Sequence, residues 1–173
     1  MQIYISRKLS LTGVVDGVRQ AVALTLTLRA AVSPETGMTV NLKEIDLWLR
    51  SLSAPEPIFP SQWLEHLFAQ AEKRFSSLGA EVYSLELGFA GEALTRFATE
   101  EIWSRSGDCV VTRDGRSSLV RWRALSSSRL GRDLPVTSWI EEVLNGQSPS
   151  FLRALELQYP GQDLRLFDFK CQG

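Results

Sequence analysis

The stretch Leu24-Thr25-Leu26-Thr27-Leu28-Arg29 alternates apolar and polar side chains with a period of two. Successive side chains of a strand point to opposite faces, so this pattern predicts a strand with one buried and one exposed face. Residues 3–11 alternate in a similar way, with Arg7 as the exception in the apolar row. Turn-forming residues from Thr12 to Gly17 separate the two runs. We therefore expect an antiparallel strand pair at the start of the chain.

Helical spacing follows this pair. Asn41 precedes an apolar stripe, and Glu44 lies three residues after it, as in a capping box. The stripe consists of Leu42, Ile45, Trp48, Leu49 and Leu52. Apolar residues at helical spacing also predict a second helix over about 61–78 and a third over about 91–104. A short, poorly patterned strand is expected between them, over 82–87.

The period then returns to two in residues 109–112 and 119–125, which flank Arg113-Asp114-Gly115-Arg116. Asp-Gly is a strong signal for a tight hairpin turn. Residues 126–133 resemble an exposed linker. A capping box at Ser138 and Glu141 predicts a further helix that Gly146 ends, and residues 155–169 contain two strand-like runs. No internal repeat is visible. The order of elements predicts an α+β fold with an antiparallel sheet and helices packed on one face.

Composition excludes several classes of protein. The chain has 173 residues, of which 44% are hydrophobic and 23% charged, so it is neither disordered nor collagen-like. Its 19 Lys and Arg residues against 20 Asp and Glu leave a net charge of −1, so no overall field attracts nucleic acid or an anionic membrane. We expect no membrane partner, since no apolar run approaches the roughly 20 residues that span a bilayer. Two cysteines and no signal-peptide layout favour a cytoplasmic location.

Residues 24–45, with Thr36-Gly37-Met38-Thr39-Val40-Asn41-Leu42-Lys43-Glu44-Ile45 as the best motif, resemble the 6-pyruvoyl-tetrahydropterin and 6-carboxy-tetrahydropterin synthase family. Gly91-Glu92-Ala93-Leu94-Thr95-Arg96-Phe97 is similar to the family's second helix. The resemblance covers roughly residues 1–125. It implies the tunnelling fold, a ββααββ unit that assembles into ring-shaped oligomers with sites between subunits.

The resemblance also implies a zinc ion held by three histidines, which this chain cannot supply. The family's first-strand position falls at or near Arg7, and its His-x-His positions fall on Val18 and Gln20. The chain has a single histidine, His66. One histidine cannot make a three-histidine zinc site, so we expect no metal and no other cofactor.

The family's other functional groups are also missing. Its Asp-His catalytic pair is matched only remotely by Glu65 and His66, which point in different directions on a helix. Its pterin-anchoring glutamate, on the strand after the second helix, falls on Thr112 or Arg123 depending on the strand matched. Neither residue replaces a carboxylate that accepts paired hydrogen bonds. We therefore assign no catalytic residue, and interpret His66 and Cys109 as structural.

Six arginines lie between Arg113 and Arg132, beside the single acid Asp114. Arg121 and Arg123 share one face of the expected strand, opposite Val120 and Trp122. Charge pairing is the simplest interpretation of these arginines, and anion or nucleic-acid binding is the alternative. We take four residues as candidates for ligand binding: Thr112, Arg121, Arg123 and Glu92.

The leading functional hypothesis is a zinc-free, catalytically inactive relative of the pterin synthases that acts as a binding or assembly subunit. The alternatives are a metal-independent enzyme for a pterin- or purine-like substrate at a subunit interface, and an anion- or nucleic-acid-binding module. We expect a tunnelling-fold-like core over residues 1–130 with an insertion at 53–90, and a helix-and-strand appendage over 131–173. We also expect a homo-oligomer, a trimer or hexamer, joined through the strands 24–28 and 119–125. The alternative is that residues 155–169 cap a sheet edge within the same chain and leave a smaller assembly.

Overall fold

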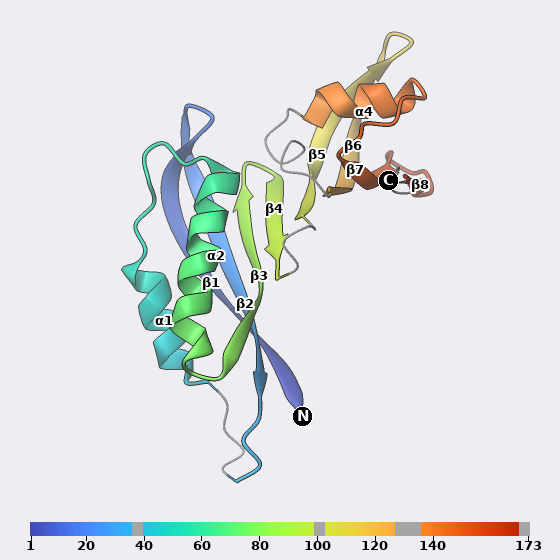
Figure 1. The fold of residues 1–173 in the computed structure, drawn as a ribbon. Coiled ribbons are helices and arrows are strands. Elements are labelled where there is room, and N and C mark those ends of the chain that lie inside the picture. Colours follow the sequence, from blue (N-terminus) through green and yellow to red (C-terminus); the bar gives the residue numbers. More distant parts are fainter. Residues whose placement is uncertain (36–39, 99–102, 127–135, 170–173) are drawn as a thin grey trace. The chain divides into compact units, whose positions relative to one another are not determined.

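A computed structural model describes residues 1–35, 40–98, 103–126 and 136–169 (Figure 1). The fold is α+β, and its antiparallel sheet has eight strands that follow one another in chain order. The chain divides into two compact units. The first unit comprises residues 1–90 and 95–98, and the second comprises 91–94 and 99–173. No helix among the described residues is both long and apolar enough to span a membrane.

The first unit begins with the expected strand pair. β1 (Gln2–Val15) and β2 (Val18–Ala31) are antiparallel and longer than the alternation predicted. Asp16 and Gly17 both adopt positive φ, at 52° and 76°, which is the geometry of the tight turn that matches strand twist. β3 (Ala80–Phe89) pairs with the other side of β2. The resulting sheet carries the fully buried residues Leu24, Leu26 and Leu28 on one face.

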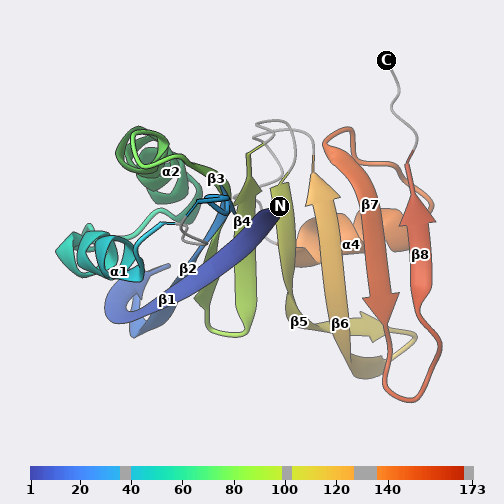
Figure 2. The same cartoon turned by 90° about the horizontal axis from the view of Figure 1, so that it is seen from below.

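Two helices cover that face of the first unit (Figure 2). α1 (Leu42–Ser51) begins at Asn41, whose side chain accepts a hydrogen bond from the Lys43 N–H at 2.9 Å, so Asn41 is the N-cap as predicted. The Glu44 carboxylate, expected to complete a capping box, pairs with Arg74 of the following helix. α2 (Pro60–Ser76) packs its apolar side on β3. Trp48 of α1 meets Phe75 of α2 edge to face, with ring centroids 5.6 Å apart. The core of this unit therefore lies between the two helices and the sheet.

The helix expected over 91–104 is wrong. Its described residues form β4 (Glu92–Phe97) and the first residues of β5 (Trp103–Arg113), while residues 99–102 lie outside the described part. Ala90 and Gly91, with φ of 42° and 77°, form the turn from β3 into β4. Helical and strand periods are hard to separate in short apolar runs. The buried Arg96 hid the alternation, because its guanidinium lies 3.7 Å from the centroid of the Phe68 ring.

Among its described residues, the second unit contains a hairpin, a helix and two further strands in chain order. β5 pairs with β6 (Arg116–Ser126) through the predicted turn, in which Asp114 and Gly115 have positive φ. α4 (Val136–Leu144) follows, and β7 (Leu152–Gln158) pairs with both β6 and β8 (Arg165–Asp168). α4 begins before Ser138, so the capping box expected there is wrong. Gly146, with φ of 84°, ends the helix as predicted.

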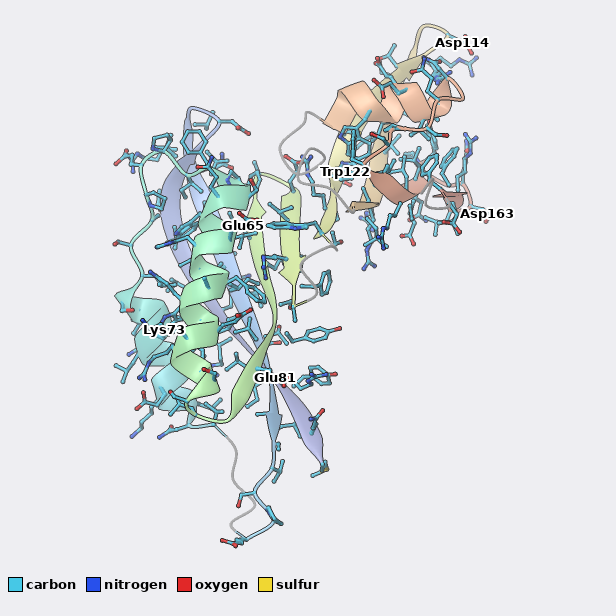
Figure 3. All side chains as sticks on the ribbon, in the orientation of Figure 1. Glu65, Lys73, Glu81, Asp114, Trp122 and Asp163 are labelled. Carbon is cyan, nitrogen blue, oxygen red and sulfur yellow. The ribbon has the colours of Figure 1, made fainter. Side chains whose placement is uncertain are left out.

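The core of the second unit lies between α4 and one face of its sheet. Trp122 of β6, which is labelled in Figure 3, is 1% exposed. Its ring meets that of Trp139 of α4 edge to face, with centroids 5.5 Å apart. Val120, Leu155 and Leu157 pack in the same cluster. The opposite face of this sheet carries no described helix.

These units differ from the expected domains. The boundary expected near residue 130 falls inside the second unit, because β6 before it pairs with β7 after it. The insertion expected at 53–90 contains α2 and β3, which are integral parts of the first unit. The linker expected over 126–133 lies, apart from the end of β6, outside the described residues.

Candidate functional site

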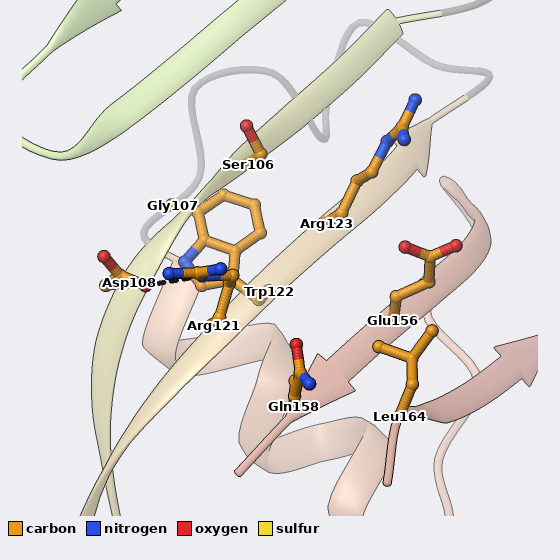
Figure 4. Close-up of a pocket in the computed structure, with 9 residues that line it drawn as sticks. All are labelled: Ser106, Gly107, Asp108, Arg121, Trp122, Arg123, Glu156, Gln158 and Leu164. Carbon is orange, nitrogen blue, oxygen red and sulfur yellow. Dashed lines mark ion pairs between the residues drawn. The ribbon is translucent and has the colours of Figure 1, made fainter. Parts of the chain in front are cut away.

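In the second unit, the face of the sheet opposite α4 holds a shallow trough of about 290 Å³ (Figure 4). Side chains and backbone of three strands line it, together with one residue next to β8. These residues are Ser106, Gly107, Asp108, Arg121, Trp122, Arg123, Glu156, Gln158 and Leu164. The trough therefore joins cations, acids and one aliphatic side chain on a single sheet face.

Strand alternation explains why these polar side chains converge. Arg121 and Arg123 are exposed on β6, while the intervening Trp122 is buried against α4. The register then forms two rows across the sheet. Asp108, Arg121 and Gln158 are neighbours in the first row, and Ser106, Arg123 and Glu156 in the second. Because the rows are two residues apart, the trough offers an acid and a cation in each.

The charges in the trough are only weakly engaged with each other. Arg121 Nε lies 3.8 Å from Asp108 Oδ1, and the two side chains are 79% and 49% exposed. Such an exposed, long ion pair contributes little stability. Arg123 and Glu156 are direct register neighbours, yet the described residues form no ion pair with either. A ligand could therefore bind these four charged side chains with little loss of existing ion-pair energy.

A second depression of about 330 Å³ continues the trough toward the turn between β7 and β8. It shares Asp108, Arg121 and Gln158 with the first. Its further lining is Leu119, Tyr159, Pro160 and Gly161. Leu119 is 58% exposed, so an apolar surface lies next to the charged rows.

The other two predicted ligand-binding residues lie outside the trough. Thr112 is near the hairpin turn, and its hydroxyl is 2.9 Å from that of Ser117 on the facing strand. Glu92 begins β4, where its Oε1 accepts a hydrogen bond from Arg105 Nη2 at 2.9 Å. The Arg105 side chain is 12% exposed, and its guanidinium lies 5.6 Å from the Trp122 ring centroid. Glu92 therefore balances a largely buried cation.

Sequence reasoning found Arg121 and Arg123 but missed Asp108, Glu156 and Gln158. The latter two lie on β7, and nothing in the sequence showed that β7 is the neighbour of β6. Asp108 lies directly before Cys109, where the predicted strand began, whereas β5 begins six residues earlier at Trp103. Arg129 and Arg132, which belong to the same arginine-rich stretch, lie outside the described residues.

The positions implied for zinc do not form a metal site. Arg7 pairs with Leu26, whereas Gln20 pairs with Gly13, six residues further along β1. That separation is about 20 Å at the rise of a strand. Val18 is 59% exposed beside the turn, and Gln20 Nε2 donates to the backbone oxygen of Val15 at 3.2 Å. Arg7 binds Asp46 instead. These residues do not fit a zinc ion.

The two candidate reactive side chains occupy ordinary structural positions. His66 is exposed on α2, and its Nε2 lies 3.0 Å from Gln70 Nε2, one helical turn away. Cys109 is 9% exposed on the α4 side of β5. Burial, with smaller contributions from Asp108 and Glu92, raises the pKa of its thiol, so at neutral pH it is a protonated, poor nucleophile. Cys171 lies outside the described residues.

Across the described ranges, no group of three His, Cys, Asp or Glu side chains is arranged to hold a metal ion. Comparisons of the chain with family models, with curated proteins and with solved structures found no match. The assignment of a function therefore depends on the trough and on the residues around it.

Proposed function

We propose that this protein is a zinc-free, non-catalytic relative of the pterin synthases, and that it binds a small anionic pterin- or purine-like molecule in the trough. The observation that carries the proposal is the pair of charged rows on β5, β6 and β7. Arg121 and Arg123 offer guanidinium groups to a carboxylate or phosphate, which guanidinium binds with paired hydrogen bonds.

Glu156 supplies the complementary half of such a site. A pterin or guanine has an amino group and a ring N–H on one edge, and a carboxylate accepts hydrogen bonds from both. Glu156 lies on β7 beside Arg123, outside residues 1–125 that the resemblance covers, so only its chemistry supports this role. A carboxylate next to two guanidinium groups favours a heterocycle with an anionic substituent.

Binding without turnover is supported by the side chains at the implied catalytic positions. No metal site forms from the three implied ligand positions: Arg7 pairs with Asp46, Gln20 donates to a backbone oxygen, and Val18 is an exposed aliphatic residue. Cys109 is a buried thiol. Among the described residues that line the trough there is no imidazole or thiol. The side chains that line it bind and orient charged groups.

Isothermal titration calorimetry of the full chain tests this proposal with three probes: pterin-6-carboxylate, guanosine monophosphate and inorganic phosphate. We expect saturable binding of the first or second probe. Arg121→Gln and Glu156→Gln should each weaken it about tenfold or more, since hydrogen bonds to charged groups contribute about 1.5–3 kcal/mol. The matched control is Arg116→Gln, which removes an exposed arginine beside the hairpin turn, outside the trough.

Absence of binding by both heterocycles, or binding that neither trough substitution weakens, would contradict the proposal. Binding of inorganic phosphate alone would also contradict it, and would favour a simple anion site.

A metal-independent enzyme for a pterin- or purine-like substrate is the second candidate. The two carboxylates in the trough, Asp108 and Glu156, favour it, because paired carboxylates can act as acid and base. Incubation with each heterocycle followed by mass spectrometry separates the two candidates. A new product that disappears in Asp108→Asn and in Glu156→Gln would establish the enzyme.

A further inference from the structure

β1 is an edge strand, and along most of its outer side its backbone groups have no backbone partner among the described residues. Val15 and Val18 flank the two-residue turn, so the odd-numbered residues of β1 bond to β2 and the even-numbered ones face outward. Two backbone contacts agree with this assignment: Met1 O accepts from Val32 N on the β2 side, and Val14 O accepts from Ile58 N on the outer side. Between residues 2 and 12 the outward groups have no backbone partner among the described residues.

An apolar row beside this edge is only half covered. Ile3, Ile5, Leu9 and Leu11 lie on the helix-covered face of the sheet but are partly exposed. Their register neighbours on β2, such as Leu24 and Leu28, are fully buried. A strand added at β1 with apolar side chains on the same face would bury this row and satisfy the outward groups.

The sequence of β1 is complementary to itself in an antiparallel arrangement centred on Arg7. In that register Ile5 faces Leu9 of a second copy, and Ile3 faces its Leu11. On the other face Ser6 faces Lys8. Ser6 and Lys8 are both outward-facing residues, so this pair exchanges backbone hydrogen bonds.

Other registers are less favourable. A shift by one position puts the apolar row opposite the polar face. A shift by two positions puts Arg7 opposite Ile5 or Leu9, and in one direction also puts Lys8 opposite Lys8. In the centred register the two Arg7 side chains face each other, but each is neutralised by Asp46 of its own chain.

We propose that two copies of this chain associate through β1, antiparallel and centred on Arg7, into a symmetric dimer with a continuous sheet. This replaces the assembly strands expected from the sequence. Residues 24–28 belong to β2, which is paired on both sides, and residues 119–125 belong to β6, which is also paired on both sides. The dimer does not depend on the ligand proposed for the trough.

Spin labels on the full chain measure the register directly by double electron–electron resonance. Cysteines are introduced singly at Gln2, Ser10 and Thr12 in a Cys171→Ser background, since Cys109 is buried. Equivalent Ser10 positions should be about 20 Å apart, six residues along the strand, and equivalent Gln2 or Thr12 positions about 34 Å apart. Equal distances for Gln2 and Thr12 identify Arg7 as the centre.

Ser6→Pro tests the role of the edge independently. It removes an outward N–H, a position at which an edge strand tolerates proline. Ser6→Ala is the matched control, because both variants lose the 2.8 Å contact with the Thr27 hydroxyl. We expect a dimer for Ser6→Ala and a monomer for Ser6→Pro in sedimentation velocity. A wild-type monomer at micromolar concentration, or label distances without this symmetry, as in a ring that joins β1 to β8, would overturn the proposal.

Discussion

Arg7 on β1 and Asp46 on α1 form a two-point ion pair, with Nε to Oδ1 at 2.9 Å and Nη2 to Oδ2 at 2.6 Å. The two residues are 39 positions apart in the chain, so the pair ties the first helix to the edge strand. The hydrogen bonds from Arg7 hold the pKa of the Asp46 carboxyl below its ordinary value. Arg7, the residue on which the resemblance places the first zinc-binding histidine, therefore has a structural role in this chain.

Asp46→Asn should lower stability at neutral pH and have little effect in strong acid. The folded-state pKa of Asp46 is lower than its unfolded pKa of about 3.9. The ion pair therefore contributes fully to the unfolding free energy above the unfolded pKa, and this contribution disappears as the pH falls through the folded-state pKa. Urea unfolding of wild type and variant between pH 7 and pH 2 measures this. A difference in unfolding free energy that stays constant over that range would contradict the assigned cause.

Replacing Arg7, Val18 and Gln20 together by histidine should not create a zinc site. Zinc–nitrogen bonds are about 2.1 Å long, whereas the β1–β2 register places Arg7 about 20 Å from Gln20. Metal analysis after dialysis against zinc provides the measurement, with wild type as the control. One tightly held zinc per chain would show that the register is wrong.

Gly107→Ala should destabilise the second unit by about 1–3 kcal/mol, the usual range for overpacking. A Cβ at this position would lie 2.7 Å from the backbone oxygen of Gly91 and 3.0 Å from Glu92 Cγ. The backbone contact leaves little room for relaxation. Chemical denaturation measures the loss, and Ser106→Ala on the preceding residue serves as the control. Equal stability of Gly107→Ala and wild type would contradict the close approach of β4 and β5.

The Cys109 thiol should react with iodoacetamide at higher pH in the folded protein than in the unfolded one. Burial raises its pKa, and the neighbouring acids Asp108 and Glu92 add to the effect. The rate of alkylation as a function of pH, in a Cys171→Ser background with and without urea, gives the two midpoints. A midpoint that is lower in the folded state would indicate an activated thiol and would contradict the structural role of Cys109.

Short sequence patterns were sufficient to predict strands, turns and helix ends that depend on a few neighbouring residues. The alternation around Leu26, the cap at Asn41, the Asp114-Gly115 turn and the stop at Gly146 all predicted features that the structure contains. The strand after Ala90 was missed because a buried Arg96 on the Phe68 ring resembles a polar position.

The sequence did not show which strands lie next to each other in the site. Arg121 and Arg123 could be placed on one face of a strand from alternation alone. Their partners Glu156 and Gln158 are about 35 residues further along the chain, and no local signal states which strand lies beside β6. The same limit led to the wrong choice of assembly strands, since an edge is defined only by the complete strand order.

A nuclear magnetic resonance titration of the arginine Nε–Hε signals with pterin-6-carboxylate tests whether the heterocycle binds in the trough. The signals are assigned with Arg121→Gln, Arg123→Gln and Arg116→Gln. We expect the signals of Arg121 and Arg123 to shift in a saturable manner while that of Arg116 stays unchanged, and Glu156→Gln to weaken the response about tenfold or more. Unchanged signals for Arg121 and Arg123 at saturating heterocycle, or equal shifts for all three arginines, would contradict the assignment of the trough as the binding site.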